Sequence, residues 1–196
     1  MRVNVGYAYI ASGKMREAIE ELSALIRSHP GFASAHYDLA LAYKQADDLA
    51  QAREEFERTV ELEPALAEAH YALALTCLEL GDTDTAIEAL RAASAQRPGY
   101  VEAWLELGTV LQQQGDVGGA IDALRRTVAL DNANAGAWNS LGLLLRRTGD
   151  TEGAKAAFAT AAELRQAEAR KKEKAISDGT ARVRAASAHP APSSPE

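Results

Sequence analysis

The chain has 196 residues, 47% of them hydrophobic and only 6% aromatic, with a formal charge of -7 at pH 7 and a pI near 5.2. This length supports one or two small globular domains, and abundant alanine beside few aromatic residues favours packed helices over a sheet, so we expect an all-α protein. The acidic balance excludes nucleic acid or an anionic membrane as the main partner, because both bind basic surfaces.

The first residues, MRVNVGYAYIASGKM, contain no clear apolar core of a signal peptide. No apolar run approaches the roughly 18 residues that span a bilayer. A single cysteine, Cys77, excludes an intrachain disulfide framework and is compatible with a reducing compartment. We therefore expect a cytoplasmic protein without a membrane span.

A period of 34 residues runs through the sequence. An alanine recurs at this spacing, and so does a second small residue that always follows a bulky apolar one. A period of this length indicates an array of structural repeats. The recurrent alanines are Ala18, Ala52, Ala86, Ala120 and Ala154, and the recurrent small residues are Gly6, Ala40, Ala74, Gly108 and Gly142.

Each copy contains two helical stripes, as residues 101–134 show. Apolar residues at i, i+3, i+4 and i+7 share one helix face, so each stripe predicts an amphipathic helix. The first stripe is Trp104, Leu107, Gly108 and Leu111, and the second is Ala120, Leu124 and Thr127.

A glycine followed by aspartate separates the two stripes. Glycine adopts the left-handed conformation that ends a helix, and an aspartate carboxylate caps the start of the next one. We therefore expect a tight turn in every copy. The pairs are Gly81-Asp82, Gly115-Asp116 and Gly149-Asp150, with Asp47-Asp48 in the second copy and Gly13-Lys14 in the first.

These repeated residues resemble the sequence pattern of the tetratricopeptide repeat family, whose 34-residue unit has the pattern W-x2-L-G-x2-Y, then A-x3-F, then P. Histidine replaces tryptophan at His36 and His70, and Asn132 and Gln166 replace the last two prolines. The match is carried by Trp104, Leu107, Gly108, Ala120 and Leu124 in the fourth copy and by Trp138, Leu141, Gly142, Ala154 and Phe158 in the fifth.

The resemblance covers residues 1 to about 168 and implies a right-handed superhelical solenoid whose first helices line a concave groove. In the register of the other copies, the first repeat of this family would begin about two residues before Met1. The chain therefore either starts with a shortened first helix or is a fragment of a longer array. The expected repeats are about 1–32, 33–66, 67–100, 101–134 and 135–168.

After the fifth copy no proline interrupts the stretch AAELRQAEARKKEKAIS. We expect the last helix to continue to about residue 177, where its charged end caps the final apolar face of the array. Residues 178–196 are biased toward Pro, Ser, Ala and Gly, which predicts a disordered tail.

Nothing in the sequence indicates an enzyme. The four histidines, His29, His36, His70 and His189, have no cysteine or carboxylate at metal-ligand spacing. Cys77 stands where the family pattern has a core tyrosine, which predicts a buried, inert thiol. We therefore expect no catalytic residues, no cofactor and no metal.

The side of each first helix opposite the packing stripe is the candidate binding surface. It carries more apolar and aromatic residues than an exposed helix face normally does, and a bound partner segment would explain them. The alternative is that part of this surface packs against the next helix of the superhelix. The candidates are Tyr7, Tyr37, Asp38, Leu41, Glu68, Tyr71, Leu75, Leu78, Glu79, Glu102, Leu105, Glu106, Asn139, Arg146 and Arg147.

Charge indicates the character of the partner. Residues 1–134 hold 11 basic and 21 acidic residues, whereas residues 135–196 hold 10 and 7. Acidic candidates border the middle of the expected groove, and Arg146 and Arg147 stand near its far end. A protein segment with apolar anchors and basic residues would be complementary.

Some members of this family hold chaperone C-termini in a clamp of lysine, arginine and asparagine. That clamp is absent, because the equivalent positions are Val3, Tyr7, Asp38, Glu68 and Ala72. The preferred interpretation is a non-catalytic adaptor that binds a partner segment in the groove. Two alternatives stay open: a targeting or assembly arm of a larger enzyme or secretion system, and a protein whose basic C-terminal helix makes the main contact.

Overall fold

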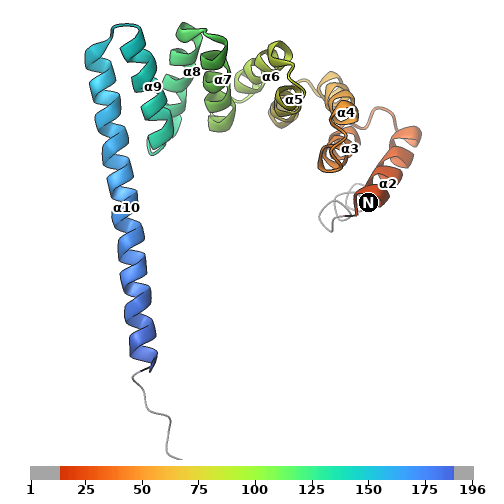
Figure 1. Ribbon diagram of the computed structural model, residues 1–196. Coiled ribbons are helices and arrows are strands. Elements are labelled where there is room, and N and C mark those ends of the chain that lie inside the picture. The colour runs from red at the N-terminus through yellow and green to blue at the C-terminus, as the bar shows by residue number, and fades with distance from the viewer. Residues whose placement is uncertain (1–13, 188–196) are drawn as a thin grey trace, which may run out of the picture. The chain divides into compact units, whose positions relative to one another are not determined.

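The computed structural model describes residues 14–187, with side chains described to residue 176, and every regular element in that range is an α-helix (Figure 1). This confirms the all-α prediction. Residues 1–13, and Tyr7 with them, lie outside the described residues. The helices are α2 (Met15–Ser28), α3 (Ala33–Gln45), α4 (Leu49–Leu62), α5 (Ala67–Glu79), α6 (Thr83–Gln96), α7 (Val101–Gln114), α8 (Val117–Leu130), α9 (Ala135–Arg147) and α10 (Thr151–Ser187).

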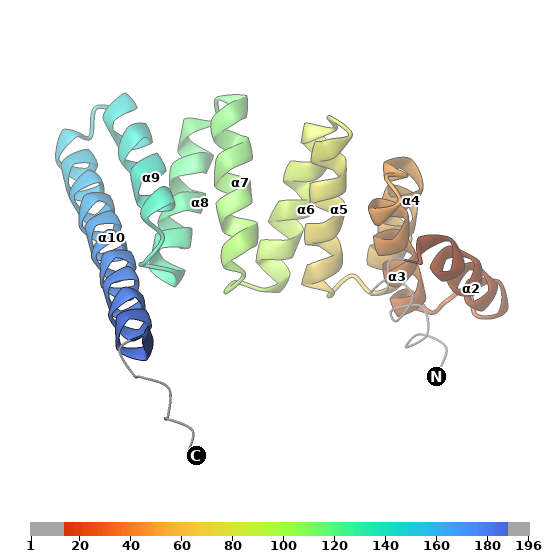
Figure 2. The ribbon, with the colours of Figure 1, turned by 60° about the horizontal axis from the view of Figure 1, so that its bottom comes forward.

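The chain divides into two compact units, one ending at Leu130 and the other beginning at Asp131. In the first unit, α3 and α4, α5 and α6, and α7 and α8 form three helix pairs (Figure 2). Packing of α2 on α3, α4 on α5, and α6 on α7 joins them in sequence order. The second unit is one helix pair, α9 and α10. These pairs confirm the helical solenoid that the 34-residue period predicts.

The recurrent small residues let the paired helices approach closely. All five recurrent alanines are buried, and none is more than 3% exposed. A Cβ atom at Gly108 would lie 2.9 Å from Leu124 Cγ, and one at Gly142 would lie 2.8 Å from Phe158 Cε1. No carbon side chain fits at such distances, so the size of these residues is set by the helix crossing.

The turns follow the predicted chemistry. Gly81, Gly115 and Gly149 have φ of 80°, 83° and 87°, the left-handed region in which glycine is least strained. Asp47 takes this place in the second copy with φ of 63°. The aspartate that follows each of these residues accepts a hydrogen bond from a backbone N–H of the next helix, at distances from 2.9 to 3.3 Å. Each turn therefore ends one helix and caps the next.

Large apolar side chains fill the space between the packed helices of the first unit. Phe56, Leu22, Leu90 and Leu124 are the largest fully buried ones, and burial of such a side chain contributes about 1.5–3 kcal/mol. Buried threonines stand among them and donate to backbone carbonyl oxygens four residues earlier in the same helix, as Thr59 Oγ1 does to Glu55 at 2.8 Å. Their hydroxyl groups are thus satisfied without interrupting the apolar core.

Helix α10 is longer than the sequence predicts. It runs to Ser187 and extends far past the end of α9 (Figure 1). The prediction of an end near residue 177 and a disordered segment from 178 is therefore wrong for residues 178–187, while residues 188–196 lie outside the described part. Gly179 weakens a helix by about 1 kcal/mol but still donates its N–H, and the first proline after α10 begins is Pro190.

Candidate functional site

The candidate residues of the first unit lie on its first helices, α3, α5 and α7. Their apolar and aromatic members, such as Tyr71 and Leu75, are neither fully buried nor fully exposed. Such side chains pack with part of their surface and leave the rest available for contact. We call this surface the first-helix face. It comprises Tyr37, Asp38, Leu41, Glu68, Tyr71, Leu75, Leu78, Glu79, Glu102, Leu105 and Glu106.

Tyr37 connects this face to the core. Its ring meets the buried ring of Phe56 edge-on, with centroids 5.7 Å apart. Burial, followed by the nearby charges of Glu68 and Asp38, raises the pKa of the Tyr37 phenol. Tyr37 therefore contributes to packing within the array, as the packing alternative proposes for part of this surface, and is also close to two carboxylates.

Asp38 is the most buried acidic residue of the face, with 9% of its surface exposed. Burial raises its pKa to about 6, because a carboxylate loses hydration when it is surrounded by protein. Asp38 thus carries its full negative charge only above mildly acidic pH.

An ion pair crosses the face between neighbouring repeats. Lys44 Nζ on α3 lies 2.8 Å from Glu79 Oε1 on α5, and both side chains are partly exposed. The sequence predicts that Glu79 contributes to this face but does not reveal its partner. The pair neutralises Glu79 in part, so the acidic character of the face is concentrated on its other carboxylates.

A cluster of four side chains occupies the part of the face between α5 and α7. The rings of Tyr71 and Tyr100 lie 5.1 Å apart, and the Arg97 guanidinium lies 4.9 Å from the centre of the Tyr100 ring. Arg97 Nη2 also donates to Glu68 Oε1. We call Glu68, Tyr71, Arg97 and Tyr100 the tyrosine cluster.

Sequence reasoning missed Tyr100 and Arg97. A signal was present, because Phe32, Leu66 and Tyr100 are bulky apolar or aromatic residues at the same position of successive repeats, immediately before a first helix. This position lies in the loop between repeats, outside the helical stripes, so the helical period alone does not predict a role for it.

The carboxylates of α7 add to the negative charge around the cluster. Burial, followed by the charges of Glu106 and Glu102, raises the pKa of Tyr71. For Tyr100, burial and the neighbouring Tyr71 and Glu102 raise the phenol pKa. Leu105 lies between these two acidic residues in the chain and is half-buried. The middle of the first-helix face therefore combines aromatic surface with several carboxylates.

The three remaining candidates belong to the second unit. Asn139 Oδ1 on α9 accepts a hydrogen bond from Arg165 Nη2 on α10 at 3.0 Å. Arg146 holds its guanidinium 5.7 Å from the centre of the Phe158 ring, and Arg147 is exposed. Asn139 and Arg146 therefore contact α10, and Arg147 presents its charge to solvent.

The tryptophan and histidine positions are structural. Trp104 Nε1 donates to the carbonyl oxygen of Pro98 at 3.0 Å, and Trp138 Nε1 donates to that of Asn132 at the same distance. In the same way, His36 Nε2 lies 3.1 Å from the carbonyl oxygen of Pro30, and His70 Nε2 lies 2.9 Å from that of Pro64. The two tryptophans are half-buried rather than fully packed. Histidine Nε2 and tryptophan Nε1 thus occupy equivalent places, each beside a carbonyl oxygen six residues earlier.

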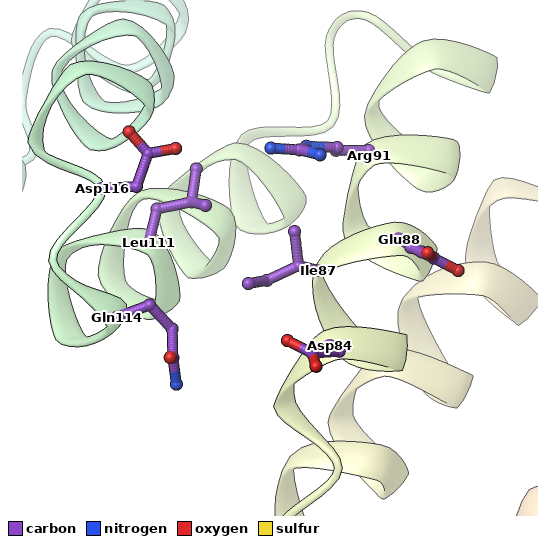
Figure 3. Close-up of a pocket in the computed structure, with 7 residues that line it drawn as sticks. All are labelled: Asp84, Ile87, Glu88, Arg91, Leu111, Gln114 and Asp116. Carbon is purple, nitrogen blue, oxygen red and sulfur yellow. The ribbon is translucent and has the colours of Figure 1, made fainter.

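A hollow in the first unit lies apart from the first-helix face. Figure 3 shows Ile87 on α6 and Leu111 on α7 pointing toward each other across it, with charged and amide groups around them. At the equivalent place one repeat earlier, Arg53 Nη1 bridges to Asp82 Oδ2 at 3.0 Å. Ile87 replaces that arginine and leaves the space open. The lining residues are Asp84, Ile87, Glu88, Arg91, Leu111, Gln114 and Asp116, and none of them is a candidate.

Cys77 is fully buried, as predicted, and burial raises the pKa of its thiol, which disfavours the reactive thiolate. The side chains that the structure describes form no group of three or more histidine, cysteine or acidic residues suited to hold a metal ion. Within the described range, no helix is long and apolar enough to cross a bilayer.

Solved structures with a similar fold include MamA, at 25% sequence identity with a TM-score of 0.77; the match covers 85% of this chain and 97% of MamA. A MamA from Desulfovibrio magneticus RS-1 is 22% identical with a TM-score of 0.72, covering 85% and 94%. YrrB, described as a TPR protein with an unusual peptide-binding site, is 17% identical with a TM-score of 0.72, covering 83% and 84%. The last two likenesses concern the fold alone.

No curated protein matches the sequence. The tetratricopeptide repeat model matches it in four overlapping stretches, residues 6–67, 37–101, 71–135 and 105–170. Repeats of this kind generally serve as non-catalytic modules that bind other proteins, so the match supports a protein–protein interaction module. Because these stretches extend over most of the sequence, the chain belongs to the tetratricopeptide repeat family.

Proposed function

We propose that this protein is a non-catalytic adaptor that holds a segment of another protein on its first-helix face. The observation that carries the proposal is the row of half-buried aromatic and aliphatic side chains on three successive first helices. The row consists of Tyr37, Leu41, Tyr71, Leu75, Leu78 and Leu105. A solvated helix face is mostly polar, so these side chains are available to pack on a partner.

Charge specifies the partner further. Glu102 and Glu106 on α7 are not paired with any described basic side chain, and Asp38 adds a third carboxylate on α3. A segment with apolar anchors and basic residues matches this arrangement. Apolar contact then supplies most of the affinity, and charge sets specificity and the rate of association.

The test compares two variants with the same change of charge. The full chain is immobilised, and proteins captured from an extract of the source cells are identified by mass spectrometry. Glu102→Lys with Glu106→Lys reverses two charges on the first-helix face. Glu88→Lys with Asp122→Lys reverses two exposed carboxylates on the second helices α6 and α8. We expect the first pair to abolish capture of a specific partner and the second pair to preserve it. Equal capture by both pairs would count against the first-helix face.

The exposed end of α10 favours a second candidate, in which this helix makes the main contact. From Arg165 to Ile176 every side chain is exposed, with five basic and two acidic residues. Such a segment suits an acidic partner or surface. Removal of residues 169–196 distinguishes the two functions, because it abolishes binding only if α10 is the contact, whereas the α7 variants then leave binding intact.

A further inference from the structure

One arginine of the chain already occupies the first-helix face. Arg97 follows the last residue of α6, and its guanidinium lies over Tyr100, which precedes α7. The same guanidinium donates to Glu68 on α5, and Tyr71 lies against Tyr100. Two aromatic rings and a carboxylate therefore make one site for a planar cation.

This contact is not part of the repeat architecture. The residues equivalent to Arg97 in the flanking repeats are Glu63 and Asp131, and those equivalent to Tyr100 are Leu66 and Asn134. Those repeats form the same helix pairs without a cation at this place. The arrangement around Arg97 is thus specific to one step of the array.

The contacts of Arg97 are weak enough for its side chain to leave the tyrosine cluster. Its side chain is 47% exposed, and that of Glu68 is 40% exposed. Ion pairs between such exposed groups are weak, because water screens the attraction and both side chains lose freedom when they pair. The exposed face of the site is therefore open to exchange with another cation.

The charge around the site exceeds what Arg97 neutralises. Glu102 lies close enough to raise the phenol pKa of both Tyr71 and Tyr100, and Glu106 acts on Tyr71 in the same way. Glu68 and Glu102 both favour the charged form of Arg97, and Glu106 lies near Tyr71 in the same cluster. An incoming basic side chain is attracted whether or not Arg97 has left.

We propose that the tyrosine cluster is an arginine-binding subsite of the first-helix face, and that Arg97 is a displaceable internal occupant that competes with an arginine of the partner segment. This inference rests on the proposed function and names the side chain that the partner supplies. Arginine is favoured over lysine because its flat guanidinium stacks on a ring while its edge donates to a carboxylate.

An internal competitor reduces the apparent affinity to the fraction of time that the site is free. Removal of Arg97 should therefore tighten binding of an arginine-containing segment about five- to tenfold, the gain expected if Arg97 occupies the site about 80–90% of the time. If Arg97 instead held Glu68 in place for the partner, its removal would weaken binding. The direction of the change decides between the two.

The experiment uses the full-length, isotope-labelled protein and the peptide acetyl-Leu-Ala-Arg-Ala-Leu-amide, followed by NMR titration. Arg97→Ala removes the competitor, and Arg97→Gln removes its charge while keeping most of its length. Matched peptides carry citrulline, which has the shape of arginine without its charge, or lysine. Glu68→Ala in the Arg97→Ala background removes the carboxylate, and circular dichroism checks that each variant is folded.

We expect both Arg97 variants to bind the arginine peptide more tightly, to bind the citrulline peptide no better than the wild type, and to lose the gain with Glu68→Ala. Unchanged or weaker binding, an equal gain for citrulline, or no binding by any form would overturn the inference. If that happens while the α7 charge reversals still abolish partner capture, the proposed function stands and only the arginine subsite fails.

Discussion

Helix α10 is continuous, yet its two halves are stabilised in different ways. From Thr151 to Leu164 it packs on α9 and buries Ala154, Ala157 and Ala161. From Arg165 to Ile176 every side chain is exposed, and an ion pair between Lys172 and Glu168 at 2.7 Å lies on its surface. The packed half is held by tertiary contact, whereas the exposed half extends a helix that is already nucleated, and each further residue adds a backbone hydrogen bond.

The largest expected change in unfolding free energy comes from placing a glutamate in each half of α10 in turn. Ala161→Glu buries a carboxylate without a partner at a fully buried site and should cost about 3–5 kcal/mol of unfolding free energy. Ala169→Glu, at an exposed site eight residues later, should change it by less than about 0.5 kcal/mol. Urea denaturation followed by Trp138 fluorescence, in chains that also carry Trp104→Phe so that one tryptophan remains, measures both. Similar midpoints for the two variants would show that the halves do not differ as the structure indicates.

A smaller effect is expected at the helix crossing that holds the packed half. A side chain at Gly142 would collide with the Phe158 ring, so Gly142→Leu should destabilise the second unit by about 1–3 kcal/mol. Gly118→Leu on α8 is the control, because the atom nearest to a Cβ there is 3.8 Å away. That change should be neutral or slightly stabilising, since leucine favours a helix over glycine by about 1 kcal/mol or less. Thermal unfolding of the two variants provides the comparison.

Removing the exposed half should leave the packed half intact. A chain that lacks residues 169–196 should lose helical signal at 222 nm. With Trp104→Phe in both chains, its urea midpoint by Trp138 fluorescence should stay close to that of the full-length chain, a difference of less than about 0.5 kcal/mol in unfolding free energy. A large fall in that midpoint would mean that the exposed half supports the packed one through contacts that the described side chains do not make.

The smallest effect concerns the ion pair on the exposed half. The hydrogen bond from Lys172, followed by that residue's charge, lowers the pKa of the Glu168 carboxyl. A lowered pKa means that the stabilising contribution is present above the unfolded value and is lost as pH falls through the folded one. Helical signal should therefore decrease slightly between about pH 6 and about pH 3, and the decrease should be smaller in Glu168→Gln. Equal acid responses would show that the pair adds nothing to the helix.

The contrast between packed and exposed helix also explains which parts of the fold the sequence predicts well. Regular spacing predicts the helix pairs, the glycine turns and the buried alanines, because burial imposes a period that residue types must follow. The end of α10 was misjudged because no buried stripe marks it, and Asp178 and Gly179 weaken a helix without ending it. On exposed helix, the boundary depends on small local preferences that sum over many residues.

The candidate site also shows what sequence periodicity predicts and what it does not. Tyr37 and Tyr71 were predicted to lie on the binding face because helix geometry places them there, and the structure puts both on first helices. Arg97 and Tyr100 were missed because their contact depends on the path of one loop and on side-chain rotamers, which no period encodes. The pairing of Lys44 with Glu79 depends on the register between repeats in the same way.

The ring N–H contact repeated at His36, His70, Trp104 and Trp138 has a consequence for how such an array can be rebuilt. Each ring nitrogen meets a carbonyl oxygen only six residues earlier in the chain. A duplicated or transplanted 34-residue segment that includes both partners carries this brace with it and needs nothing from its new neighbours to form it. Arrays lengthened by 34-residue segments that begin before the carbonyl, for example at Pro98, should thus keep every such contact within one segment, whereas a cut between Pro98 and Trp104 would separate the two partners.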